Sequence, residues 1–422
     1  MAKLKVLFFA EGATLAHVAR PLILAKGLDP NCFDVTLCRP ASYSRLTDGL
    51  PFRVVNLDCQ DASVFARRLA SGSPLYDFET LSTYVRADLS LIDHEKPDVV
   101  IGDFRLSLSV SARLRATPYI TVCDAYWSPE APLIPALPVM SFTHFAPLGI
   151  CESIFRLVSP LAFRFHALPM ERLRAKFGLA PLGYDLRHCY TDADLRLFAN
   201  FPALFPEVRP HAGADFIGPI AWSPNANGNI DFLSSGDQPL VYITMGSSGD
   251  LSILAHIIPI FEELGSRIVV TTAGRPLPFK PQSQNTKVFD FLPGAAVCQK
   301  ASLVVCNGGS PTTNQALKCG VPVLGIPQNM DQFLNMRAVE AYGAGLLVRS
   351  DRINATRLRN VVKMMLVNPK FTERAQILAQ SIPIELPSLA NFIDKLLGRH
   401  AAMTQNDATT MRTKGTGNDF ES

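Results

Sequence analysis

His17 and Asp103 have the residue types of a general base and its orienting partner. His17 follows a small-residue loop after an apolar run at residues 5–10, and Asp103 directly follows a second apolar run at 99–102. Histidine changes charge near neutral pH, so a neutral imidazole can remove a proton from a hydroxyl group. A carboxylate at the other ring nitrogen would fix the tautomer and stabilise the imidazolium. For His17 alone, the alternative is a structural histidine at the start of a helix.

A second stretch, residues 301–345, has the residue types and the order that favour phosphate binding. The apolar run 303–306 ends in the turn 307–309, whose two glycines let a ligand approach the backbone. Ser310 is predicted to cap the next helix and Pro311 to be its first residue, which leaves N–H groups of the first turn exposed. A helix start of this kind favours an anion. The alternative is an ordinary strand-to-helix turn, with glycines for tight geometry.

Alternating strands and helices must position these two groups. Their order predicts a Rossmann-like αβα layer in each half of the chain. If the first and fourth strands are neighbours, His17 and Asp103 lie at adjacent carboxyl ends, the edge at which open α/β sheets bind ligands. The predicted strands are residues 5–10, 33–38, 53–57, 99–102 and 119–123 in the first half, and 240–245, 303–306 and 321–326 in the second.

The chain is predicted to form two domains and a tail. Its 422 residues suffice for two domains of ordinary size, here 1–221 and 240–400. Between them, residues 222–239 are rich in Gly, Asn and Ser without periodicity, as expected of a linker. Residues 401–422 are polar and rich in Thr, Asn and Gly, and we predict that they form a disordered tail.

The composition argues against several classes of protein. A hydrophobic content of 48% suits a globular chain, and a net charge of +3 gives no argument for nucleic-acid binding. The nine cysteines form no CxxC pair or His/Cys cluster, so we interpret them as reduced thiols in a cytoplasmic protein without a metal site. The Asp-x-Asp motif at 192–194 is interpreted as a solvated turn. No apolar run approaches the eighteen or so residues that span a bilayer.

The stretch 301–345 resembles the donor-binding signature of nucleotide-sugar-dependent glycosyltransferases of the GT-B fold, in the family that holds bacterial natural-product glycosyltransferases and UDP-glucuronosyltransferases. The resemblance implies an α/β fold in which two Rossmann-like domains face each other across a cleft. It implies inverting transfer of a hexosyl group from a UDP- or dTDP-sugar to a hydroxyl group of a hydrophobic small-molecule or lipid acceptor, without a metal or other cofactor. The matching positions are Gly308-Gly309, Thr312-Thr313, Gly320-Val321-Pro322, Pro327, Asp331-Gln332, Asn335 and Gly343-Ala344-Gly345.

The resemblance also assigns roles to residues. The sequence GATLAHVARPLILA around His17 resembles the family's first loop, which carries the catalytic base, and VVIGDF around Asp103 resembles the segment of its partner carboxylate. Asp124, Tyr126 and Trp127, near the same crevice, are candidates for acceptor binding, with core or rim packing as the alternative. The candidate donor contacts are Gly246, Ser247, Ser248, Phe291, Leu292, Asn307, Gly308, Gly309, Thr312, Thr313, Gln315, Asp331 and Gln332.

Within this donor set, Phe291 would stack on the nucleotide base, and the backbone near Leu292 would read the base edge. The alternative for Phe291 is a core phenylalanine at a strand end. Asp331 and Gln332 match the pair that hydrogen-bonds the hydroxyl groups of the donor sugar. Gln315 replaces the acid that commonly holds the ribose.

Other departures from the family pattern keep a different class of function open. Asn307 stands where most relatives have a histidine, Pro311 replaces a glycine whose N–H is usually available, and Ala16 replaces a glycine before the base. The first two changes weaken stabilisation of the leaving diphosphate. A non-catalytic auxiliary protein of the same fold is therefore the alternative, and a sugar-nucleotide epimerase is a third hypothesis.

Residues 131–177 are rich in Pro, Phe and Leu, in the region where the family inserts acceptor-binding segments. Their apolar composition favours a hydrophobic acceptor. Scattered arginines leave open a peripheral contact with anionic lipid at the inner face of a membrane, and ordinary packing of Pro-broken helices is the alternative. These arginines are Arg156, Arg164, Arg172 and Arg174.

Overall fold

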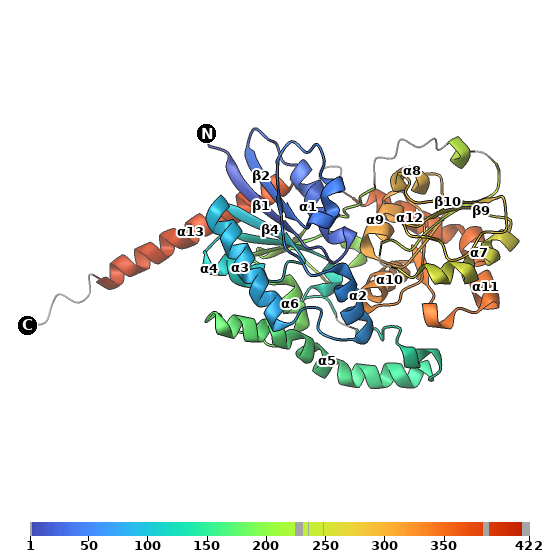
Figure 1. The fold of residues 1–422 in the computed structure, drawn as a ribbon, viewed down its shortest axis with the longest axis horizontal. Coiled ribbons are helices and arrows are strands. Elements are labelled where there is room, and N and C mark those ends of the chain that lie inside the picture. Colours follow the sequence, from blue (N-terminus) through green and yellow to red (C-terminus); the bar gives the residue numbers. More distant parts are fainter. Residues whose placement is uncertain are drawn as a thin grey trace, which may run out of the picture.

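Two parallel β-sheets, each covered by helices, form the body of the protein in a computed structural model that describes residues 2–132, 134–223, 231–234, 236–247, 249–382 and 388–415. The two αβα units lie side by side, the first drawn in blue to green and the second in yellow to orange (Figure 1). This confirms the predicted α/β class with two Rossmann-like units.

The first sheet has seven parallel strands in the order β3-β2-β1-β4-β5-β6-β7. Its central strands are mainly apolar because helices cover both faces, as is usual for parallel sheets. The strands are β1 (Leu4–Ala10), β2 (Phe33–Arg39), β3 (Arg53–Asn56), β4 (Val99–Asp103), β5 (Tyr119–Cys123), β6 (Leu195–Phe198) and β7 (Ala214–Phe216). The helices of this half are α1 (Leu15–Lys26), α2 (Ala62–Ser71), α3 (Phe78–Glu95), α4 (Leu108–Leu114), α5 (Leu148–Lys176) and α6 (Leu186–Thr191).

Strands β1 and β4 are neighbours, as the site hypothesis requires. Their register pairs Ala10 with Asp103, the last residue of each strand. The loop after β1 leads into α1, whose first turn carries His17. The sheet therefore brings both candidate residues to one carboxyl edge, at the point where the strand order reverses.

The second sheet has six parallel strands in the order β10-β9-β8-β11-β12-β13. Here too the strand order reverses between β8 and β11, so the turns after these strands share one edge. The strands are β8 (Leu240–Thr244), β9 (Arg267–Thr271), β10 (Thr286–Phe289), β11 (Leu303–Cys306), β12 (Val323–Gly325) and β13 (Gly345–Leu347). The helices are α7 (Leu254–Glu263), α8 (Gly294–Cys298), α9 (Ser310–Lys318), α10 (Met330–Tyr342), α11 (Ala355–Val367) and α12 (Pro369–Gln380).

The last helix, α13 (Leu389–Gly415), crosses back to the first sheet. Phe392 and Ile393 are buried in one core with Val18 and Leu22 of α1, so the two helices cover the same face. Its position corrects the predicted domain limit at 400, since residues from 389 pack on the first unit. The predicted tail at 401–422 also differs from the structure, in which helix α13 continues to residue 415. Residues 416–422 lie outside the described part.

Residues 134–147, here called the strap, lie between the two units. The strap includes the short 3-10 helix Ser141–His144 and leads into α5. Packing of Pro-broken helices was the alternative interpretation of this region, but α5 is a single helix of 29 residues with Pro160 and Pro169 inside it. It runs along the lower margin of the molecule (Figure 1). No described helix is long and apolar enough to cross a membrane.

Candidate active site

His17 and Asp103 are in direct contact at the carboxyl edge of the first sheet. The Nδ1 atom of His17 lies 2.7 Å from Oδ1 of Asp103. The carboxylate is fully buried, whereas the imidazole is 17% exposed and borders the space between the two units. Within the described part of the chain, Nε2 of His17 has no hydrogen-bond partner. The structure thus confirms the expected contact and leaves Nε2 as the nitrogen that can accept a proton.

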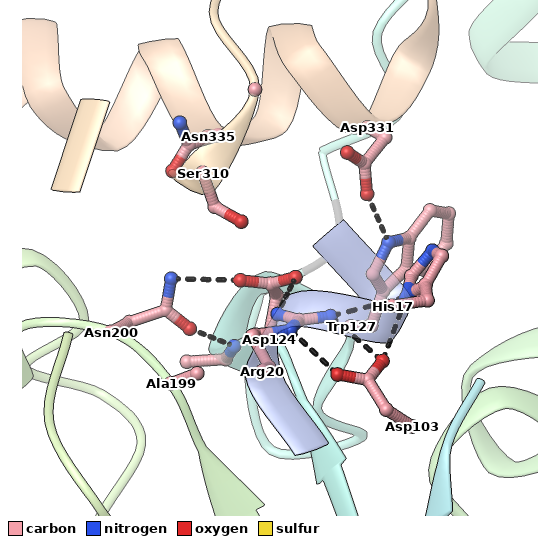
Figure 2. Close-up of polar contacts among 12 residues, drawn as sticks. His17, Arg20, Asp103, Asp124, Trp127, Ala199, Asn200, Ser310, Asp331 and Asn335 are labelled. Atoms are coloured by element: carbon pink, nitrogen blue, oxygen red, sulfur yellow. Dashed lines mark hydrogen bonds and ion pairs between the residues drawn. The ribbon is translucent and has the colours of Figure 1, made fainter. Parts of the chain in front are cut away.

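Arg20, one turn after His17 on α1, holds the other side of the carboxylate. Its Nε atom donates to Oδ2 of Asp103 at 2.7 Å, and Nη2 donates to Oδ1 at 2.9 Å (Figure 2). Burial alone would raise the pKa of Asp103, but the charges of Arg20 and His17 outweigh it and keep the pKa below its ordinary value. Asp103 is therefore ionised at neutral pH.

The network continues from Arg20 to Asp124 and Asn200. Arg20 Nη1 donates to Oδ2 of Asp124 at 2.9 Å, and Asn200 Nδ2 donates to Oδ1 at 3.1 Å. Asn200 in turn accepts the backbone N–H of Ala125 at 2.7 Å (Figure 2). Asp124 was predicted to bind acceptor. Its Oδ2 fixes the buried guanidinium of Arg20 and its Oδ1 is held by Asn200, so the structure gives Asp124 a positioning contact.

Aromatic rings surround the imidazole. Phe104 stacks on His17 with ring centroids 4.8 Å apart, and Tyr190 lies 5.2 Å from Phe104. Phe104 has a φ of +56°, a conformation that costs a bulky residue free energy and that often occurs at functional sites. Trp127 packs edge-on against Tyr190 at 5.0 Å. These rings give the space next to the base an apolar lining.

The donor side of the crevice begins at the turn after β11. Gly308 has a φ of +82°, and a Cβ atom there would lie 2.6 Å from the Met336 side chain, so only glycine fits. Asn307 is buried, and its Oδ1 accepts the N–H of Gly309 at 3.2 Å. The helix start differs from the prediction: Gly309 is the N-cap of α9 and Ser310 is the first helical residue.

The first turn of α9 also corrects the expected donor groups. The Thr313 N–H donates to the carbonyl of Gly309 at 3.2 Å, so it is not free for a phosphate. The Thr313 hydroxyl accepts from Nδ2 of Asn335 at 2.8 Å, and the same amide donates to the carbonyl of Gly308 at 2.8 Å. Asn335 therefore holds the glycine turn in place. Thr312 stays half-buried at the edge of the crevice.

Asp331 and Gln332 lie at the start of α10, facing the first unit. Oδ1 of Asp331 accepts from Nε1 of Trp127 at 2.9 Å, a contact between the two units that Figure 2 shows. Burial and the nearby charge of Asp124 raise the pKa of Asp331. Gln332 Oε1 accepts backbone N–H groups of Gln328 and Asn329, and completes a capping box with Asn329. Gln332 thus has a structural contact, and its position three residues after Asn329 is the sequence pattern of a capping box.

The donor candidates Phe291, Leu292 and Gln315 differ in exposure. Phe291 is half-exposed, and its ring lies beside Gly274, on the side where a side chain would be, whereas Leu292 is buried. Gln315 is buried, and its Nε2 lies 3.4 Å from the carbonyl of Trp222 at the start of the linker.

In the loop after β8, Ser247 is exposed and Ser248 lies outside the described residues. Gly246 has a left-handed φ of +61°. Arg275 donates to the carbonyls of Gly246 and Gly249 at 2.8 and 2.7 Å, and so holds this loop.

Two further residues of the first unit lie in packed surroundings. Tyr126 is buried against Phe205, with ring centroids 6.0 Å apart, as the core-packing alternative for this acceptor candidate expected. Asp192 accepts from both Arg113 and Arg174, at 2.8 and 3.1 Å, so the Asp-x-Asp motif is an ion-paired structural element and not a solvated turn. Among the residues that the structure describes, no group of His, Cys, Asp and Glu side chains is placed to hold a metal ion.

The strap joins this site to the second unit. Val139 N–H donates to the carbonyl of Gln328 at 2.7 Å, and Arg349 donates to the carbonyl of Leu137 at 2.7 Å. Thr143 bonds to the carboxylate of Asp351. Together with the contact between Trp127 and Asp331, these bonds hold the two units against each other around the crevice.

Sequence reasoning missed Arg20, Asn200 and Phe104. Arg20 carried a detectable signal, because it lies three residues after His17 and therefore on the same helical face. Asn200 follows a strand end in the same way as Asp103 and Asp124, so its position at the carboxyl edge could also have been inferred. The left-handed backbone of Phe104 has no sequence signal.

Comparison with solved structures confirms the fold, the GT-B arrangement of two Rossmann-like units. The glycotransferase of kitacinnamycin superimposes with a TM-score of 0.69 at 18% identity, over 96% of this chain and 99% of that one. Residues 258–396 also match the profile described as Erythromycin biosynthesis protein CIII-like, C-terminal domain.

More similar sequences come from mycobacteria. The PGL/p-HBAD biosynthesis glycosyltransferase of Mycobacterium tuberculosis is 39% identical over 93% of this chain and 92% of its own length. A PGL/p-HBAD biosynthesis rhamnosyltransferase of Mycobacterium bovis is 39% identical over 89% of this chain and 84% of its own. The chain belongs to this glycosyltransferase family. A relative from the same species named as inactive is 38% identical over 60% of this chain and 70% of its own.

Proposed function

We propose that this glycosyltransferase moves a sugar from a UDP- or dTDP-sugar to a hydroxyl group of a hydrophobic lipid-type acceptor, with inversion at the anomeric carbon. The hydrogen bond between His17 Nδ1 and Asp103, which leaves Nε2 for the acceptor, is the observation that carries the proposal. The names of the relatives, which refer to PGL/p-HBAD biosynthesis, support an acceptor on the route to a glycolipid, and one of them supports rhamnose as the sugar.

In this mechanism, His17 Nε2 takes the proton of the acceptor hydroxyl as its oxygen attacks the anomeric carbon. Asp103 keeps the proton on Nδ1 and stabilises the imidazolium that forms. A general base of this kind contributes about a hundredfold to ten-thousandfold in rate. The apolar rings of Phe104 and Tyr190 exclude water from the base, which limits hydrolysis of the donor.

The leaving nucleotide diphosphate would be held at the turn 307–309 and the start of α9. The N-terminus of α9 supplies positive potential there without a metal ion. Phe291, half-exposed beside Gly274, is available to stack on the base. Because Asp331 is bonded to Trp127, donor binding requires this contact between the units to separate.

The test is a nucleotide-release assay with UDP- and dTDP-sugars, including rhamnose donors, against lipophilic hydroxy compounds. Release that depends on acceptor should fall at least a hundredfold in His17→Ala. His256→Ala, at an exposed position on α7, is the matched control and should keep full activity. Equal release by His17→Ala and wild type would overturn the role of the base.

A non-catalytic auxiliary protein is the second candidate, favoured by Asn307 and Pro311 and by the relative that is named as inactive. It predicts no nucleotide release with any donor. An epimerase instead predicts turnover of the donor without acceptor. A thermal shift with UDP or dTDP in the absence of turnover would support the auxiliary role.

A further inference from the structure

Helix α5 exposes a continuous apolar face to solvent. Six large side chains recur every three or four residues, so they form one stripe along the helix. The most exposed is Leu157, at 80%. The helix lies at the margin of the molecule, with one side turned away from both sheets (Figure 1). The residues of this α5 stripe are Ile150, Ile154, Leu157, Leu161, Phe165 and Leu168.

The exposed charges of α5 all have one sign. Arg164 flanks the stripe one turn after Leu161, and Arg172 occupies the next stripe position after Leu168. The two acidic side chains of the helix are not exposed. Glu171 is buried and accepts hydrogen bonds from backbone N–H groups of the following loop, and Glu152 is half-buried. The exposed charged residues of the helix are Arg156, Arg164, Arg172 and Lys176.

A second copy of the chain fits this face poorly. From Ile150 to Leu168 the stripe is about 27 Å long and roughly 10 Å wide, since a helix rises about 1.5 Å per residue. It therefore offers roughly 270 Å² per partner, well below the ~800 Å² per partner of a standard protein interface. Pairing two stripes would also bring arginines against arginines.

We propose that the α5 stripe docks on the surface of an anionic lipid membrane. Apolar side chains would enter the boundary between headgroups and acyl chains, and the flanking cations would meet anionic headgroups. The helix has the composition of an interfacial helix, with an apolar face, basic flanks and two prolines, and it cannot span the bilayer. The inference rests on this surface and not on the proposed reaction.

Co-sedimentation with vesicles tests the proposal on the full chain. Wild type should bind vesicles of equal phosphatidylcholine and phosphatidylglycerol, bind phosphatidylcholine vesicles more weakly, and be released by high salt, because salt screens the headgroup charges. Leu157→Glu should lower the partition coefficient about tenfold or more. The double variant Arg164→Gln and Arg172→Gln should bind both vesicle types alike.

The chain offers matched controls on α11. Val367 is also 80% exposed, and Arg357 is an exposed arginine on the same helix. Val367→Glu and Arg357→Gln should bind as wild type does. The proposal is overturned if wild type sediments with neither vesicle type, if it binds both equally, or if Val367→Glu loses as much binding as Leu157→Glu. A solution dimer that Leu157→Glu converts to monomer would show that a second copy occupies the face instead.

Discussion

Two buried arginines in the first unit each lie between two carboxyl groups, but the residues next to the two clusters differ. Arg20 lies between Asp103 and Asp124, with contacts of 2.7 and 2.9 Å. Arg105 lies between Glu11 and Asp88, with contacts of 3.2 and 3.0 Å. Both clusters sit at the carboxyl edge of the first sheet. The Arg20 cluster includes the partly exposed imidazole of His17, so the geometry of this cluster can act on a substrate in the crevice.

The pKa values of the carboxyl groups differ in direction between the clusters. Burial is the largest influence in both and favours the neutral form. At Asp103 the charges of Arg20 and His17 overcome burial, so the pKa is lowered. At Glu11 and Asp88 burial prevails over Arg105, so the pKa is raised. At Asp103, the two contacts from Arg20 and the contact with His17 thus keep a buried carboxylate ionised, which a base–orienter pair requires.

Arg105→Met gives the largest expected effect on stability. It leaves Glu11 and Asp88 without their cation, and breaking a buried ion pair in this way costs about 3–5 kcal/mol. Urea unfolding measures the loss. Turnover per folded molecule should fall less than in Asp103→Asn, because Arg105 makes no hydrogen bond to His17 and only the charge of Glu11 acts on the imidazole. A large loss of turnover in the folded fraction would show that the two clusters are coupled.

Asp103→Asn should act mainly on the reaction. The amide cannot stabilise the imidazolium, so turnover should fall about a hundredfold or more, or roughly 3 kcal/mol in the barrier. Single-turnover nucleotide release measures it, with circular dichroism to confirm folding. Unchanged turnover would place the base elsewhere.

Arg20→Gln should lower turnover by loosening the carboxylate that orients His17. The variant loses the donors at 2.7 and 2.9 Å to the two oxygens of Asp103, so turnover should fall about tenfold, or roughly 1.4 kcal/mol in the barrier. Arg20→Lys restores the charge but not the fork geometry and should recover only part of the loss. Nucleotide release per folded molecule measures the effect, and unchanged turnover in Arg20→Gln would contradict the positioning role of Arg20.

The pH dependence of stability should have opposite signs in the two clusters. Asp103 has a lower pKa in the folded state, so its contribution is complete above the unfolded value of about 4 and is lost as pH falls through the folded value. Asp88 has a raised pKa, so its contribution is greatest at low pH and declines as pH rises through the folded value. Unfolding of Asp103→Asn and Asp88→Asn between about pH 3 and 7 tests this, since parallel curves would contradict the assignment.

The sequence predicted the sheet better than the side-chain network. Apolar runs located β5 and β11 to the residue, because strands buried on both faces have no other pattern. The neighbouring positions of β1 and β4 then brought His17 to Asp103. The role of this pair stays a prediction.

Contacts in the folded chain decide the surroundings of the predicted site residues. Gln332 matched a sugar-binding position, and at the start of α10 its side chain makes a local capping contact. Trp127 and Asp331 are about two hundred residues apart and meet only because the units face each other, which no local pattern encodes. Arg20 and Arg105 look alike in the sequence and both are buried, so only their contacts distinguish them: Arg20 holds the carboxylate that bonds His17, whereas Arg105 holds Glu11 and Asp88.

The strap connects the second unit directly to helix α5. Its backbone is fastened to the second unit at Leu137 and Val139, and it runs without interruption into α5. Any rotation that separates Trp127 from Asp331 must either break these fastenings or pull on the near end of α5. The position of α5 and the separation of the two units are therefore coupled. A contact that holds α5 in place from outside would alter how readily the crevice opens.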